Sequence, residues 1–551
     1  MSHPDGPRTG RPPTVAANGM VTTPHYLASA AGLQALQRGG SAVDAAIAAN
    51  AVLCVVYPHM AGLGGDGFWL IADADGQVEA IDASGPAARG ATLEAYRSRY
   101  GTEIPARGAQ AALTVPGAVD GWRLAHERHG RLPWDSLFRA AIGHARDGMP
   151  VSRSLADWLL ADQGILAARP ATAAVYLPGG RLLREGHRLQ QPDLARTFEH
   201  LAAHGPRDGF YRGSTAERIC AALGPLGSPL TPDDFAGYRA EWVEPLTGGY
   251  RGLTVTELPP ATQGLTALQL FHLIEGFDLT AFGEGTADYY HHLAEAVKLA
   301  FADRDEWLTD PRFVDIPVDR LISKEYADER RRRIDPQHAA DIETVPAGIP
   351  YPRPHERRAP SGDTCYFAAA DSDGTVVSLI QSIYHDFGSA EVGGDTGVLV
   401  QNRGAFFSLD EDHPNHLAPG KRTFHTLAPA LLLAGGRPHL ACGSMGGEGQ
   451  PQTQAALVTR IVDFGYDVQQ AIEAPRWLMG RTWGTPSRDL SLEGRISDQT
   501  LRELARRGQP VRPVTDWNDT MGHAQAIRVD HRHGFYEGGA DPRGDGAALG
   551  Y

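Results

Sequence analysis

A threonine at position 364 begins a predicted strand directly after a long polar segment that is rich in proline. Cleavage of the chain between Asp363 and Thr364 would leave an α-amine beside the Oγ of the same threonine. With a typical pKa of about 7.7 to 8.0, this amine would accept the hydroxyl proton near neutral pH, and no separate catalytic histidine would be required. The pair therefore predicts a threonine nucleophile that is exposed by cleavage of its own chain. The alternative is a threonine that simply opens a strand.

The segment before this threonine, from about 335 to 363, carries prolines at positions 336, 346, 350, 352, 354 and 360. Six prolines in so short a span predict an exposed, non-regular segment that is loose enough to be cut and to move away. A plain linker between two domains is the alternative interpretation.

A second motif with chemical potential is the turn GSMGG at 443–447, between a predicted strand end at Ala441 and a helix expected to start near Gln452. Successive glycine N–H groups just before a helix N-terminus form a concave donor site for an anion or a developing oxyanion. A plain strand-to-helix turn is the alternative.

The elements that would position these residues can be predicted from residue spacing. A β-hairpin is expected from Thr364 to Ala370 and from Thr375 to Tyr384, with its turn over 371–374. A second hairpin is expected around Asp75-Gly76. Helical spacing of Ala and Leu predicts two helices in the ranges 27–40 and 41–57, and further helices follow within 132–148 and 290–308. The chain therefore mixes strands and helices throughout, in an α/β (α+β) arrangement.

Several common site types lack support in the sequence. The stretch GLGGDG at 62–67 matches GxGxxG, but a helix precedes it and a strand follows, which is the reverse of a dinucleotide site. It is interpreted as a turn where the backbone approaches another segment closely. No HExxH, GxSxG or SxxK spacing occurs, and His291 and His292 lie on adjacent helix faces. We therefore expect no metal and no cofactor.

Composition limits the partners further. The chain has 551 residues with 42% hydrophobic content and a formal net charge of −15, so nucleic acid and anionic membrane surfaces are unexpected partners. Four cysteines occur without a CxxC pair, as expected for buried thiols in a reducing compartment. Residues 1–24 contain no apolar stretch long enough for a secretory signal, and 42–57 is too short to span a bilayer. A cytoplasmic location is expected.

Specific motifs along nearly the whole chain resemble the γ-glutamyltranspeptidase family of N-terminal-nucleophile hydrolases. They include AGLGGDGFWLI, VPGAVDGW, ADRDEWLTDPRFVDIP, the strand at Thr364, GDTGVLVQNRGAFFS, PGKRTFHTLAPALLL, GSMGG, APRW and ADPRGDGAALGY. The resemblance implies a four-layer αββα sandwich and a precursor that cleaves itself at its nucleophile. Residues 1–363 would become a large subunit and 364–551 a small one, and the two would stay associated as a heterodimer. Whether two such heterodimers associate is left open.

The resemblance also implies roles for individual residues. Thr364 matches the nucleophile, Ser382 matches the hydroxyl that hydrogen-bonds it, and Gly446 and Gly447 match the oxyanion-hole pair. The chain departs from the pattern of enzymes that bind a γ-glutamyl group at several positions. His425-Thr426 replaces a serine pair, Tyr384 replaces an asparagine, and two further departures concern the charged ends of the glutamyl group. Ser84 stands where those enzymes place an arginine for the α-carboxylate, and Phe406 where they place an aspartate for the α-amino group.

Other substitutions most resemble the oxamate amidohydrolase branch of the family. Oxamate is small and carries one negative charge, so a single cationic or dipolar contact beside the oxyanion hole would suffice. The expected substrate-binding residues are Arg403, His425 and His385 as carboxylate-binding candidates, together with Tyr384, Thr426 and Asn402. The alternatives are a γ-glutamyltransferase or glutathione hydrolase, a glutaryl-cephalosporin acylase, and a catalytically inactive binding homologue.

Overall fold

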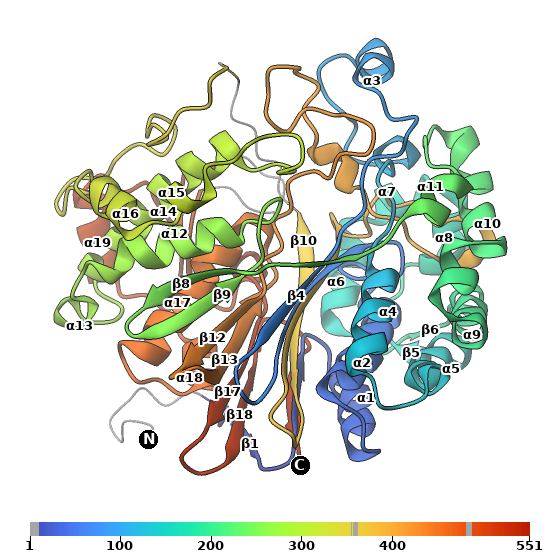
Figure 1. Cartoon of the computed structure of the whole chain (residues 1–551), viewed down its shortest axis with the longest axis horizontal. Coiled ribbons are helices and arrows are strands. Elements are labelled where there is room, and N and C mark those ends of the chain that lie inside the picture. Colours follow the sequence, from blue (N-terminus) through green and yellow to red (C-terminus); the bar gives the residue numbers. More distant parts are fainter. Residues whose placement is uncertain (1–9, 354, 356–361, 481–486) are drawn as a thin grey trace.

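The computed structural model describes residues 10–353, 355, 362–480 and 487–551, with Asp363 described by its backbone. Two seven-stranded antiparallel sheets lie face to face at the centre (Figure 1). In order across the first sheet, the strands are β1 (Thr14–Ala16), β18 (Phe535–Ala540), β17 (Ala524–Asp530), β13 (Arg437–Ser444), β12 (Ala430–Ala434), β9 (Leu253–Glu257) and β8 (Leu246–Tyr250). In the second sheet they are β19 (Ala547–Gly550), β2 (Met20–Thr23), β10 (Asp363–Ala370), β11 (Val376–Tyr384), β3 (Asp66–Ala72), β4 (Val78–Ala83) and β7 (Glu241–Val243).

Helices cover the outer face of each sheet (Figure 1). Beside the second sheet lie α1 (Tyr26–Gln37), α2 (Ala42–Val56), α4 (Ala118–His129), α5 (Arg139–Asp147), α6 (Arg153–Ala161), α7 (Gln163–Ala167), α8 (Pro170–Tyr176), α9 (Pro192–Pro206), α10 (Ser214–Leu223) and α11 (Pro232–Gly237), with α3 (Leu93–Tyr100) at the top. Beside the first lie α12 (Gly264–Glu275), α13 (Leu279–Phe282), α14 (Ala287–Trp307), α15 (Val318–Leu321), α16 (Lys324–Arg331), α17 (Gln450–Val462), α18 (Val468–Glu473) and α19 (Asp498–Arg506). This is the αββα sandwich that the family resemblance implied.

Smaller strands complete the fold. A three-stranded sheet is formed by β14 (Trp477–Met479), β15 (Leu490–Glu493) and β16 (Val511–Val514), and a two-stranded one by β5 (Met149–Pro150) and β6 (Arg188–Leu189). In the described part of the chain, no helix is long and apolar enough to cross a membrane.

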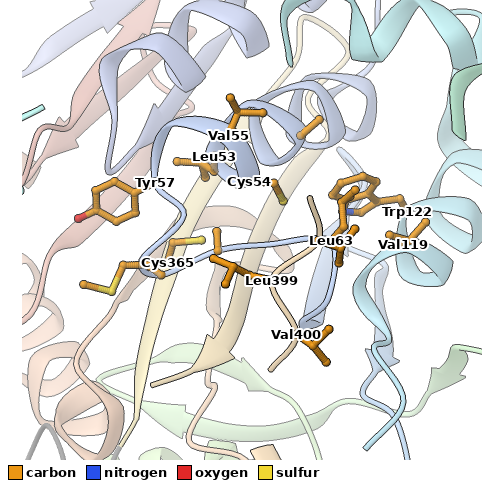
Figure 2. Packing of buried hydrophobic residues seen from close by; sticks show 14 of the residues in the cluster. Leu53, Cys54, Val55, Tyr57, Leu63, Val119, Trp122, Cys365, Leu399 and Val400 are labelled. Carbon is orange, nitrogen blue, oxygen red and sulfur yellow. The ribbon is translucent and has the colours of Figure 1, made fainter. Parts of the chain in front are cut away.

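Strand β10 shows how the sequence builds the layers. Tyr366 and Ala368 lie in the apolar cluster between the sheets, whereas Cys365 and Phe367 lie in the cluster under the helices. This alternation follows from the period of two in a strand that is buried on both faces. Figure 2 shows Cys365 in the helix-side cluster with Cys54 of α2, so the core fixes the register of the strand that begins at the candidate nucleophile.

The structure confirms both predicted hairpins, β10–β11 and β3–β4, and all four predicted helices. Between α16 and β10, the described residues of the segment from about 335 to 363 contain no helix before Asp363, as the prolines predict. Residues 354 and 356–361 of that segment lie outside the described chain. The helix after the GSMGG turn begins at Gln450, two residues before the predicted start.

Candidate active site

Thr364 is fully buried at the start of β10, opposite an irregularity in β11. Asp363 pairs with Tyr384 and Cys365 with Gln381, so two residues of β11, Ser382 and Ile383, face the single residue Thr364. Such a bulge bends the strand locally and re-aims side chains, and it is common beside active sites.

Gln450 contacts the Thr364 hydroxyl directly. Its Nε2 lies 3.4 Å from Thr364 Oγ1, and its Oε1 accepts a hydrogen bond of 2.9 Å from the backbone N–H of Ala428. Because Gln450 is the first residue of α17, this contact ties the helix start to Thr364. The backbone contact fixes the amide orientation so that the NH₂ group faces the threonine.

Ser382 and Tyr384 form the end of β11. Ser382 Oγ accepts hydrogen bonds from Tyr384 N at 2.8 Å and from Arg403 Nη2 at 3.2 Å. Tyr384 has a φ of +82°, which is a strained value for a residue other than glycine. Its ring stacks on His385 with the centroids 4.5 Å apart. The strand end is therefore held in one conformation by several contacts.

Arg403 is a completely buried cation next to this strand end. Its guanidinium lies 4.4 Å from the centre of the Tyr384 ring, and burial lowers the pKa of Arg403 to about 10, so it stays protonated at neutral pH. Within the described chain, its Nε and Nη1 have no hydrogen-bond partner. A buried arginine with open donors is costly unless an anion completes its hydrogen bonds.

His425 is close enough to Arg403 for the two groups to interact electrostatically, and each of its ring nitrogens faces an oxygen atom. Its Nε2 is 3.0 Å from Asp66 Oδ2, and its Nδ1 is 2.8 Å from the carbonyl oxygen of Thr423. Burial and the nearby charge of Arg403 lower the pKa of His425, although Asp66 opposes this effect. Asp66 Oδ1 accepts from the N–H groups of Gly85 (3.1 Å) and Gly117 (3.0 Å). The carboxylate therefore orients the ring within a fully buried cluster.

The glycine turn lies between β13 and α17. Gly446 and Gly447 both have positive φ angles, +116° and +53°, which glycine adopts at little cost. The carbonyl oxygen of Gly447 accepts a hydrogen bond of 2.9 Å from Gln263 Nε2. Gln263 in turn contacts Arg304, which forms a buried ion pair of 2.8 Å with Glu448.

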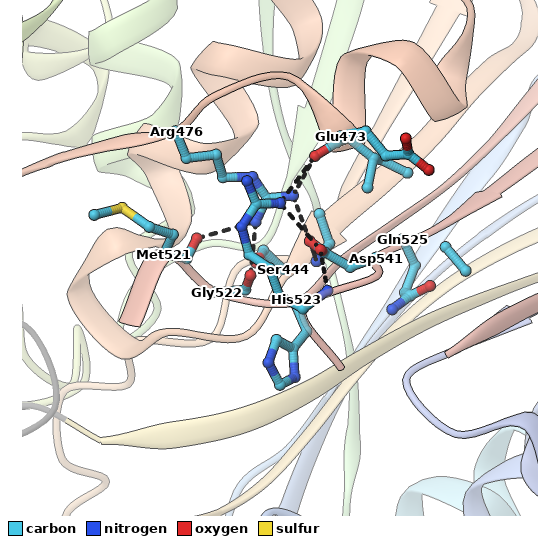
Figure 3. Close-up of polar contacts among 12 residues, drawn as sticks. Ser444, Glu473, Arg476, Met521, Gly522, His523, Gln525 and Asp541 are labelled. Atoms are coloured by element: carbon cyan, nitrogen blue, oxygen red, sulfur yellow. Dashed lines mark hydrogen bonds and ion pairs between the residues drawn. The ribbon is translucent and has the colours of Figure 1, made fainter. Parts of the chain in front are cut away.

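A second buried network, centred on Arg476, supports this turn (Figure 3). Arg476 Nη1 donates to the carbonyl oxygens of Met521 (3.0 Å) and Gly522 (2.7 Å), and its Nη2 pairs with Asp541. A Cβ at Gly522 would lie only 2.4 Å from the carbonyl oxygen of Met445, so the 521–522 segment packs directly against the glycine turn. Arg476 thus fixes the segment on which the candidate oxyanion hole rests.

The structure brings the other predicted residues to the same region, with different surroundings. Asn402 Oδ1 accepts a hydrogen bond of 3.0 Å from the backbone N–H of His385, and its Nδ2 donates to the carbonyl oxygen of Ala106 at 2.6 Å. Asn402 therefore holds the loop after β11. Thr426 is buried beside His425, and its Oγ1 has no hydrogen-bond partner in the described residues. His385 is half-buried above the Tyr384 ring.

The two departing positions that concern the charged ends of a γ-glutamyl group make local contacts. Ser84 Oγ donates to Asp82 Oδ1 at 2.5 Å. Phe406 is buried with its ring centroid 5.3 Å from that of Tyr384 and 4.8 Å from that of Phe424. Neither position therefore presents a charged group that would bind an end of an amino acid.

Sequence reasoning missed four residues of this region: Asp66, Gln450, Gln263 and Arg476. Asp66 and Arg476 lie inside motifs that carried the family resemblance, GLGGDG and APRW, but their roles depend on partners far away in the chain. The position of Gln450 at the start of the helix after the glycine turn was the one local signal that pointed toward the site.

Comparison with known proteins agrees with this architecture. The model of the gamma-glutamyltranspeptidase family matches residues 28–551. The chain is 45% identical over 532 residues to a glutathione hydrolase-like proenzyme of Bacillus subtilis, covering 96% of this chain and 98% of the relative. It is 44% identical over 542 residues to the oxamate amidohydrolase proenzyme of Klebsiella pneumoniae, covering 98% and 99%.

Among solved structures, the cephalosporin acylase from Bacillus halodurans superposes with a TM-score of 0.90 at 37% identity, covering 100% of this chain and 98% of that one. All three relatives match this chain over nearly the full length of both proteins, and the first two are named as proenzymes. The chain is therefore a hydrolase that belongs to the γ-glutamyltranspeptidase family of autoprocessing amidohydrolases.

Proposed function

We propose that this chain cleaves itself between Asp363 and Thr364 and then hydrolyses a small amide that carries one carboxylate, with oxamate as the favoured substrate. In maturation, Thr364 Oγ attacks the carbonyl carbon of Asp363, the peptide nitrogen leaves as the new α-amine, and water hydrolyses the resulting ester. Residues 1–363 and 364–551 remain together because strands of both parts share each central sheet.

In turnover, the α-amine of Thr364 takes the Oγ proton as Oγ attacks the amide carbonyl. The oxyanion that forms is stabilised by N–H groups of the Gly446-Gly447 turn, whose conformation is supported by Gln263 and by the Arg476 network. The leaving ammonia takes its proton from the α-ammonium group. Water then attacks the acyl ester, with the α-amine again as the base, and releases the dicarboxylic acid.

Arg403 is the observation that carries the substrate assignment. It is buried beside Ser382, and its Nε and Nη1 lack partners in the described chain. Each of these nitrogens shares an edge of the guanidinium with Nη2, which gives one of its two hydrogens to Ser382 Oγ, so a carboxylate would be held by two parallel hydrogen bonds on the edge that stays open. Thr426, next to His425 in the chain, has a buried hydroxyl without a hydrogen-bond partner in the described residues and is a further candidate donor.

The same surroundings oppose a γ-glutamyl group. A glutamyl α-carbon carries both a carboxylate and an ammonium, and Ser84 and Phe406 supply a charge to neither. Each charge left unpaired in a buried site costs about 1 to 3 kcal/mol, which corresponds to roughly 10- to 100-fold weaker binding per charge. A monoanionic amide avoids the unpaired ammonium.

Glutathione hydrolysis stays the second candidate because the Bacillus subtilis relative, named glutathione hydrolase-like, is as similar as the oxamate amidohydrolase. The test is a steady-state comparison on matured protein of ammonia release from oxamate, cleavage of glutathione, and deacylation of a glutaryl cephalosporin. We expect the highest kcat/KM with oxamate. Efficient glutathione cleavage without ammonia from oxamate would refute the assignment, and efficient deacylation would favour the acylase alternative.

A further inference from the structure

Gly362, two residues before the candidate nucleophile, is enclosed on two sides by the site that Thr364 would use. A Cβ at position 362 would lie 2.1 Å from Cδ2 and 2.3 Å from Cε2 of the Tyr384 ring. On the other side, a Cβ at Gly447 would lie 2.4 Å from the carbonyl oxygen of Gly362. The backbone at 362 therefore runs between the Tyr384 ring and the glycine turn, and the Cα of residue 362 has room for a hydrogen atom but not for a Cβ.

The Tyr384 ring has little freedom to give way. It stacks on His385 with the planes 27° apart and packs on Phe406, and the Arg403 guanidinium covers it at 4.4 Å. The Tyr384 backbone is tied to Ser382 Oγ at 2.8 Å. A side chain at 362 would thus displace the backbone of residue 362 itself.

The glycine turn is equally constrained. The carbonyl oxygen of Gly447 accepts from Gln263 Nε2, and the N–H of Gly449 donates to the carbonyl oxygen of Gly446 at 2.9 Å. Movement of residue 362 away from the ring would press it into this turn, where the oxyanion is proposed to form. Either displacement would shift the neighbouring carbonyl of Asp363.

We propose that a glycine at position 362 is a positioning requirement of self-cleavage and that it has no role in the mature enzyme. The inference rests on the proposed cleavage at Asp363–Thr364. The scissile carbonyl is one residue beyond Gly362, and a displacement of about 1 Å of a reacting group can slow a reaction about 100-fold. Once the bond is cut, residue 362 is no longer held against the nucleophile and its side chain ceases to matter.

The test is the rate of self-cleavage of Gly362→Ala, followed on denaturing gels, with Gly143→Ala as a matched control. A Cβ at Gly143, in α5, meets no atom within 4 Å, so the control changes the same residue type without a clash. We expect Gly362→Ala to mature about 10- to 100-fold more slowly, with kcat/KM per cleaved molecule equal to wild type. The proposal would be overturned if Gly362→Ala matured at the wild-type rate. It would also be overturned if the fully cleaved variant lost as much kcat/KM as it lost in maturation rate.

The contact with Tyr384 is tested by a double-variant cycle that does not depend on absolute rates. Tyr384→Ala removes the ring atoms that clash, so Gly362→Ala should slow maturation little in that background. An equal slowing in both backgrounds would overturn the proposed steric mechanism. The single variant Thr364→Ala separates the two proposals. Cleavage of Thr364→Ala would refute the proposed nucleophile. If Thr364→Ala stays uncleaved but the single variant Gly362→Ala matures at the normal rate, only the requirement for glycine at 362 is refuted.

Discussion

His425 Nε2 lies 3.0 Å from Asp66 Oδ2, and both side chains are fully buried although 359 residues separate them in the chain. The pair links the start of β3 to the segment before β12 and places a carboxylate and an imidazole next to Arg403. It therefore combines a structural contact between distant segments with an influence on the charge environment of Arg403.

The first prediction concerns this pair. Asp66→Asn keeps the shape of the side chain but removes the charge that orients His425. We expect kcat/KM for oxamate to fall about 10- to 100-fold, because the variant loses a buried hydrogen bond to a charged group. The measurement is ammonia release by matured protein. Asp75→Asn, at an exposed hairpin turn, is the control. Unchanged kcat/KM in Asp66→Asn would show that the pair is dispensable.

The second prediction concerns Arg403. Arg403→Met removes the cation, so KM for oxamate should rise at least about 10-fold, whereas turnover of the neutral amide acetamide should change little. Arg403→Lys keeps the charge without the two-pronged geometry and should fall in between. Equal effects on oxamate and acetamide would exclude a contact between Arg403 and the substrate carboxylate.

The third prediction concerns the support of the glycine turn. Arg476→Lys loses the paired donation to Met521 and Gly522, which should loosen the oxyanion donors and lower kcat about 10- to 100-fold while KM stays near wild type. Arg495→Lys is the matched control, since Arg495 pairs with Glu493 at 2.6 Å in the neighbouring β15. An equal change in kcat and KM would contradict a role confined to the transition state.

The fourth prediction concerns pH. Burial, together with a hydrogen bond to Asp386, raises the pKa of Asp162 to about 8. The folded chain then keeps a proton that the unfolded chain releases near pH 4, so the free energy of unfolding should fall as pH rises from about 4 to about 8. Asp162→Asn removes this titration, and its Tm should vary less between pH 5 and 8 than that of wild type. The exposed control Asp135→Asn should retain the wild-type slope; an identical slope in Asp162→Asn would disprove the effect.

The strands and turns of the site were predictable because their signals are local. Two largely apolar runs on either side of an Asp-Gly turn indicated the hairpin at Thr364, and GLGGDG indicated a close backbone approach. The structure confirms that approach: a Cβ at Gly64 would lie 2.1 Å from the carbonyl oxygen of Leu399, and one at Gly65 2.3 Å from that of Ser382.

The partnerships within the site were not predictable by the same reasoning. Asp66 belongs to the same glycine-rich stretch, but nothing within several residues of it indicates His425 as its partner, because the two meet only when the sheets pack. Likewise, the contact of Arg476 with the 521–522 segment joins residues that are 46 positions apart in the chain, so it depends on tertiary packing. Local residue patterns predict the helices, strands and turns, but only tertiary packing determines which side chains contact one another in the site.

If Thr364 is the nucleophile of its own maturation, the chain should stay uncut in the variant Thr364→Ala. Wild-type protein should yield two fragments on a denaturing gel, with the smaller one beginning at Thr364 by N-terminal sequencing. The variant should remain a single chain of 59.1 kDa without ammonia release from oxamate. Normal cleavage in Thr364→Ala, or a wild-type fragment that begins elsewhere, for example at the adjacent Cys365, would show that Thr364 is not the nucleophile.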